Sequence, residues 1–226
     1  MRKYKLNQYK GPLDSKQISN GINAANDNAK RLLSDAELLR DNGRFASAIA
    51  LTVLSIEESG KESVLRNLAL SETDESIAAS WKFYRSHKIK NAHWLIPPLI
   101  VMGVKGLDLS KRIYEANSAH RDYLDNLKQI SLYTDCLDDA KWSSPTIEIR
   151  EDLCKSIIRI AQLLLGARKI SIEDIDIWIE HMRPVIGASE GEKKVAISGW
   201  YRALCRKGLI EDNEDRMEKF INTANA

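Results

Sequence analysis

One segment, residues 43–61 (GRFASAIALTVLSIEESGK), constrains the fold of this chain most strongly. On an α-helix, at about 100° per residue, its small and apolar side chains form one stripe that continues through Val64 and Leu68. Glu57 falls in the middle of this stripe. A carboxylate at a core-facing position is costly to bury alone, so we expect another part of the chain to supply a partner.

Several side chains are candidates for that partner. Lys61 follows Glu57 by one helical turn, in the favourable acid-then-base order, while Glu58 points toward a flank of the helix. We therefore predict a structural ion-pair group of Glu57, Glu58 and Lys61, with His87 or Lys90 as the external partner. The alternative is a carboxylate–histidine site for a metal or for proton transfer.

Helical periodicity dominates the sequence, and alternating strand patterns are absent, so we predict an all-α fold. The first helix begins at Asp14 or Ser15 and stops at Gly43. Further helices are expected over residues 44–70, 73–87, 92–102, 111–131, 147–167 and 190–207, with another capped by Ser171. A polar loop at 138–145 separates an antiparallel bundle (residues 12–137) from a C-terminal helical extension (residues 146–210) packed on it.

Bulk properties narrow the class of protein. The net charge of +2 over 226 residues gives no overall field for nucleic acid, so any such surface must be local. The longest apolar run, residues 94–102, is too short to span a bilayer, and no signal peptide precedes it. The three cysteines show no disulfide or metal spacing. We expect a cytoplasmic protein without membrane contact, metal or other cofactor.

Two basic groups are candidates for chemistry. Arg85, His87 and Lys90 lie at the end of the third expected helix, where histidine suits acid–base work near neutral pH. Arg121 and Lys128 are two turns apart on a later helix, on the same flank, which suits phosphate binding. For both groups the alternative is ordinary helix capping or a solvated face.

Three segments together resemble a known family. GRFASAIALTVLSIEESGK, FYRSHKIK and LKQISLYTD are similar to the AbiV abortive-infection family, a branch of the HEPN superfamily, and the resemblance covers residues 24–205. It implies a HEPN-like helical bundle, a homodimer, and bacterial defence in which an infected cell is arrested before phage multiply, by a block of gene expression or translation.

The resemblance also implies a site. Many HEPN proteins are metal-independent endoribonucleases with an Arg-x4-His motif, and KQISLY keeps that spacing with Lys128 for arginine and Tyr133 for histidine. The candidate catalytic residues are therefore Glu57, His87, Lys128 and Tyr133. The candidate RNA-binding residues are Arg85, Lys90 and Arg121.

Two other functions compete with RNA cleavage. The first is a non-enzymatic helical module that senses or sequesters a phage-encoded or translational protein. The second is a nucleic-acid reader in the last helix, where cations accompany Trp200 and Tyr201. These cations are Lys193, Lys194, Arg202, Arg206 and Lys207.

Overall fold

The computed structural model describes residues 7–86, 119–166 and 168–211, and these residues are mostly helical, which confirms the predicted all-α class. The helices are α1 (Ser15–Asp41), α2 (Phe45–Ser59), α3 (Lys61–Ala69), α4 (Asp74–Arg85), α8 (Ala119–Leu132), α9 (Pro145–Glu148), α10 (Glu151–Leu164), α11 (Ile172–Met182) and α12 (Glu190–Arg206). A short 3-10 turn, η2 (Arg183–Val185), follows α11. The expected helix at 92–102 lies outside the described residues.

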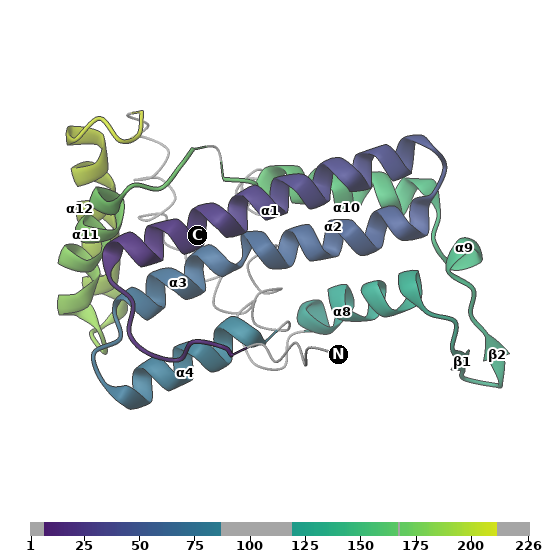
Figure 1. The fold of residues 1–226 in the computed structure, drawn as a ribbon, viewed down its shortest axis with the longest axis horizontal. Coiled ribbons are helices and arrows are strands. Elements are labelled where there is room, and N and C mark those ends of the chain that lie inside the picture. Colours follow the sequence, from purple (N-terminus) through teal and green to yellow (C-terminus); the bar gives the residue numbers. More distant parts are fainter. Residues whose placement is uncertain (1–6, 87–118, 167, 212–226) are drawn as a thin grey trace.

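The long hairpin of α1 and α2 forms the axis of the bundle (Figure 1). Asp14 caps α1 in a reciprocal capping box with Gln17, and Gly43 closes the turn with a φ of 73°, a conformation that favours glycine. The Ser55 hydroxyl donates a 2.7 Å hydrogen bond to the Ala29 carbonyl of α1. The two helices are thus joined by a buried polar contact as well as by apolar packing.

The helix expected over residues 44–70 is interrupted at Gly60, which ends α2 and precedes α3. Glycine has a helix propensity about 1 kcal/mol worse than alanine, so it is the weakest point of the segment. Its φ of −65° keeps the backbone near helical geometry. The interruption gives the two halves different neighbours, because α2 packs on α8 and α10 whereas α3 packs on α4 and α11.

Two apolar clusters make up the core of the described residues. The first joins α1, α2, α8 and α10 through side chains such as Leu33, Val53, Leu124 and Ile158. The second joins α1, α3, α4 and α11 and includes Ile22, Leu65, Trp81 and Ile175. Since α10 shares a core with α2 and α8, the loop before it does not separate two independent cores.

A small β-hairpin stands where a polar loop was expected. Strands β1 (Cys136–Leu137) and β2 (Lys141–Trp142) pair antiparallel, and Asp138 and Ala140 between them adopt positive φ angles of 40° and 60°. The helix expected over 147–167 is also divided, because Ile149 is extended and buries its side chain in the first cluster.

The last two helices match the sequence prediction. Ser171 caps α11 with Asp174 at the third position, and Ser189 caps α12 with Glu192 in the same way. Figure 1 shows α11 and α12 at one end of the bundle and the hairpin at the other. Within the described part of the chain, no helix combines the length and hydropathy needed to cross a membrane.

Candidate functional site

Glu57 is buried, with only 3% of its surface exposed, and its described partner is Lys128 of α8. The lysine Nζ donates to Glu57 Oε1 at 2.8 Å and lies 3.1 Å from Asp125 Oδ1, one turn earlier on α8. Lys128 is itself only 8% exposed. Two carboxylates from two helices thus hold one buried ammonium group.

Burial and the neighbouring carboxylates act in opposite directions on the pKa of Lys128. Burial alone would lower the pKa of the ammonium group, but the hydrogen bonds and charges of Glu57 and Asp125 raise it above the ordinary 10.5. Lys128 is therefore a permanent cation at neutral pH.

The other two members of the predicted ion-pair group, Glu58 and Lys61, pair with each other. Lys61 Nζ contacts Glu58 Oε1 at 2.5 Å, and it lies 5.3 Å from the centre of the Tyr84 ring. Lys61 thereby links α3 to α4. His87 and Lys90, the expected external partners of Glu57, lie outside the described residues.

Tyr133 follows the end of α8 and is 59% exposed. It lines a hollow of about 460 Å³ with Asn126, Gln129, Ile130, Asp135, Leu137 and Ser143. Neither Glu57 nor Lys128 lines this hollow. The two ends of the KQISLY segment therefore face different surroundings, one a buried ion pair and the other an open surface.

Arg85 is the one member of the expected RNA-binding group whose side chain is described. Its Nη2 donates to the Tyr9 carbonyl at 2.7 Å, and the guanidinium lies 5.2 Å from the centre of the Trp81 ring. Arg85 thus holds the segment before α1 against α4. Arg121 belongs to α8, but its side chain lies outside the described part, as does Lys90.

Several large apolar side chains in the β-hairpin and beside it in the sequence are exposed, and we call them together the hairpin surface. Trp142 and Ile147 are each 76% exposed. The other members are Leu132, Tyr133 and Leu137. Large exposed apolar side chains are found at many interaction sites, and sequence periodicity had not indicated these.

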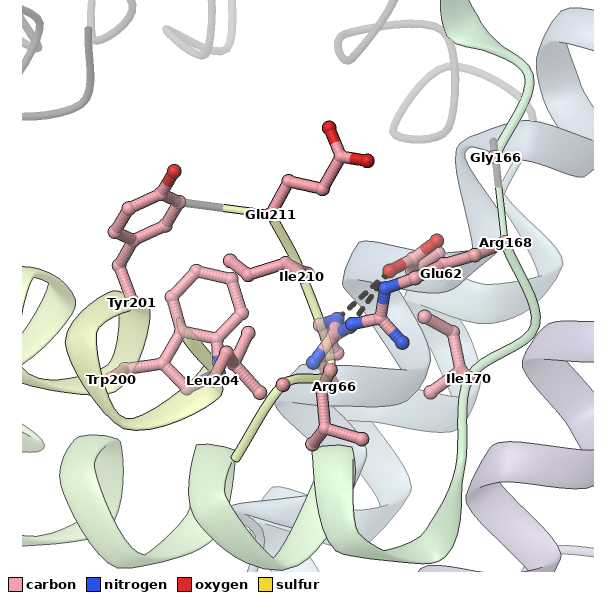
Figure 2. Close-up of a pocket in the computed structure, with 12 residues that line it drawn as sticks. Glu62, Arg66, Gly166, Arg168, Ile170, Trp200, Tyr201, Leu204, Ile210 and Glu211 are labelled. Atoms are coloured by element: carbon pink, nitrogen blue, oxygen red, sulfur yellow. Dashed lines mark hydrogen bonds and ion pairs between the residues drawn. The ribbon is translucent and has the colours of Figure 1, made fainter. Parts of the chain in front are cut away.

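A larger hollow, of about 770 Å³, lies between α3, the segment after α10, and α12 (Figure 2). The charged residues that line it are Glu62, Arg66, Arg168 and Glu211. No sequence pattern indicated a common site for these residues, because they belong to segments about 100 residues apart. We call this hollow the α3–α12 pocket.

The aromatic residues of α12 face the body of the protein. Trp200 packs edge-to-face against Trp178 of α11, with ring centres 5.2 Å apart, and Tyr201 is 9% exposed. Lys207 is paired with Glu173 at 2.8 Å. Trp200 and Tyr201 therefore take part in packing against the body of the protein. Among the described residues, no group of three or more His, Cys, Asp or Glu side chains could hold a metal ion.

Comparison with known protein families gives one match. The model of the family described as AbiV, HEPN_AbiV, matches residues 17–166, more than half of the chain. The match ends before the C-terminal helices α11 and α12, whereas the resemblance had been expected to continue to residue 205. No curated protein and no solved structure gives a match.

Proposed function

The chain belongs to the AbiV family of HEPN proteins, and from this premise we propose that it is an antiphage abortive-infection protein. In this role it arrests infected cells by blocking gene expression or translation. The support is the family match over residues 17–166, which includes Glu57, Lys128 and Tyr133.

Binding of a protein partner, rather than RNA cleavage at Lys128 and Tyr133, is the mechanism that the geometry favours. The observation that carries it is the buried contact of Lys128 with Glu57 and Asp125. Lys128 is engaged by two carboxylates, so its charge is already used in an internal ion pair. Tyr133 lines a hollow to which Lys128 does not contribute, which gives no support to a catalytic pair of the two.

The hairpin surface is the proposed contact site. Trp142 and Ile147 are each 76% exposed, and aromatic and aliphatic groups of this kind anchor protein interfaces. We assign it to self-association of two copies of this chain in the cytoplasm. The homodimer then engages a phage-encoded or translational protein, with RNA as the competing target.

Phage plating combined with an RNA-decay assay tests this function. Tyr133→Phe keeps the ring but removes the hydroxyl, so it should leave protection intact, whereas Trp142→Ser should weaken protection by disrupting the interface. Purified wild-type protein should leave RNA uncut. RNA cleavage that disappears in a folded Tyr133→Phe variant would instead establish the ribonuclease mechanism.

A further inference from the structure

A stripe at the end of α8 is largely exposed and borders the β-hairpin. Its members are spaced three or four residues apart, as on one helical face, and are Asn126, Gln129, Ile130 and Tyr133. With Asp135, Leu137 and Ser143 they line the hollow of about 460 Å³, which we call the α8–hairpin hollow. Figure 1 shows the hairpin following α8 at this end of the bundle. The volume falls within the range of roughly 300–1,000 Å³ usual for ligand sites.

Asp135 is the one charged residue that lines this hollow, and it has no ion-pair partner among the described residues. Its Oδ1 accepts a 2.7 Å hydrogen bond from the Cys136 amide, and its own amide donates to Ser143 Oγ at 3.0 Å. These contacts hold the carboxylate in place. Residues 135–143 contain three aspartates and one lysine, Lys141, which gives the hairpin a net charge of −2. The hollow therefore favours a cationic group.

The strand register separates the hollow from Trp142. Cys136 pairs with Trp142 and Leu137 pairs with Lys141, and successive side chains of a strand point to opposite faces. Leu137 lines the hollow, so Trp142 lies on the other face of the hairpin. A group bound in the hollow therefore does not have to displace a second copy of the chain that contacts Trp142.

The lining supplies hydrogen-bond acceptors and an aromatic ring that are accessible to solvent. Asn126, Gln129 and Asp135 are exposed, and Tyr133 is 59% exposed. A guanidinium group carries five N–H donors in one plane, pairs with a carboxylate through two parallel hydrogen bonds and stacks on aromatic rings. An ammonium group is a compact point charge with three donors and makes less use of such a lining. A phosphate would meet the Asp135 carboxylate and be repelled.

We propose that the α8–hairpin hollow binds an arginine side chain of the protein partner. The inference rests on the proposed protein-binding function and names the chemistry by which the partner is recognised. Asp135 forms the ion pair, the Tyr133 ring stacks on the guanidinium, and the carboxamide oxygens of Asn126 and Gln129 accept its remaining N–H groups. Arginine is also among the residues enriched at the energetic centres of protein interfaces.

NMR titration of the full chain with the peptide acetyl-Gly-Arg-Gly-amide, at about 0.15 M salt, tests the proposal. The backbone amide signals of Gln129 and Tyr133 should shift and saturate. The same peptide with citrulline in place of arginine keeps the planar shape without the charge, and it should bind at least about tenfold more weakly. Equal binding of the citrulline peptide, or no shift with the arginine peptide, would overturn the proposal. Shifts of these signals with a mixed-sequence single-stranded RNA would overturn it as well.

Asp135→Asn and Asp139→Asn form a matched pair of variants. Each removes one carboxylate from the hairpin segment, but only Asp135 lines the hollow. Asparagine at position 135 still offers an oxygen to the Cys136 amide, so the hairpin should stay folded, and binding of the arginine peptide should weaken about tenfold or more. Asp139→Asn should bind the peptide as the wild type does. Equal effects of the two variants would reduce the attraction to the general charge of the hairpin and rule out the site.

Two further measurements separate this site from the proposed function. Asp135→Asn should leave the mass of the homodimer unchanged, because Trp142 lies on the other face of the hairpin, and should weaken protection in phage plating. A monomeric wild type that binds the arginine peptide would contradict self-association and still support the hollow. Full protection by an Asp135→Asn variant that has lost peptide binding would overturn the role of the hollow in recognising the partner.

Discussion

Lys128 on α8 donates a hydrogen bond to Glu57 on α2 at 2.8 Å, across 71 residues of sequence. Both side chains are buried, and Asp125 provides a second carboxylate 3.1 Å from the ammonium group. Removal of one member of a buried pair leaves an uncompensated charge, which typically costs about 3–5 kcal/mol. The contact therefore fixes how α8 lies against the bundle.

Apolar replacement of the pair should be tolerated better than loss of one partner. Lys128→Met removes the ammonium group that both Glu57 and Asp125 contact and should lower the free energy of unfolding by about 3–5 kcal/mol. Glu57→Leu should cost less stability, since Lys128 still has Asp125 as an ion-pair partner. The double variant should recover part of the loss, and urea unfolding of all four proteins measures this coupling. Losses that simply add would show that the two side chains do not interact.

High pH should remove the stabilisation that Lys128 provides. The folded pKa of this lysine is raised above its ordinary 10.5, so its contribution is complete below that pH and is lost as pH rises through the folded pKa. The difference in unfolding free energy between wild type and Lys128→Met should stay constant to about pH 10 and shrink above it. A difference that shrinks between pH 7 and 9 would contradict this assignment.

Gly166 should resist substitution, unlike a glycine of α12. A Cβ at Gly166 would lie 2.9 Å from Asn26 Nδ2, whereas one at Gly191 would meet nothing within 4 Å. We expect Gly166→Ala to lower the unfolding free energy by about 1–2 kcal/mol through overpacking. Gly191→Ala should raise it by up to about 1 kcal/mol because alanine is the better helix former. Thermal unfolding of the two variants provides the comparison, and similar effects of both would contradict it.

The hairpin surface should control the oligomeric state. Trp142→Ser and Ile147→Ser remove its two most exposed apolar groups and should convert the proposed dimer to a monomer. Light scattering during size-exclusion chromatography measures the mass directly. Val195→Ser, an equally exposed position on α12, is the control and should leave the mass unchanged. A monomeric wild type, or a dimer that survives both changes, would exclude this interface.

Features encoded locally could be predicted from the sequence. The caps at Asp14, Thr73 and Ser171 form because a polar side chain reaches backbone amides within three residues. The burial of Glu57 also followed from local helical spacing. The caps and the burial of Glu57 depend on residues within a few positions of one another, so a sequence pattern is enough to predict them.

Features that depend on distant segments could not be predicted. Lys128 was singled out as a phosphate ligand, but only the packing of α8 on α2 places it beside Glu57. The α3–α12 pocket requires Arg66, Arg168 and Trp200 to meet from three segments. The β-hairpin depends on positive φ angles at Asp138 and Ala140, residue types that do not demand them.

Phage plating on cells that produce the Glu57→Leu/Lys128→Met double variant is the most direct test of whether Lys128 has a structural or a chemical role. This variant removes the ammonium group while its apolar replacements preserve the core, and its folding is checked by urea unfolding. If the pair serves only to position α8, protection against phage should equal that of the wild type. Loss of protection in a folded, equally abundant double variant would contradict this and assign Lys128 a direct part in the reaction or in RNA binding.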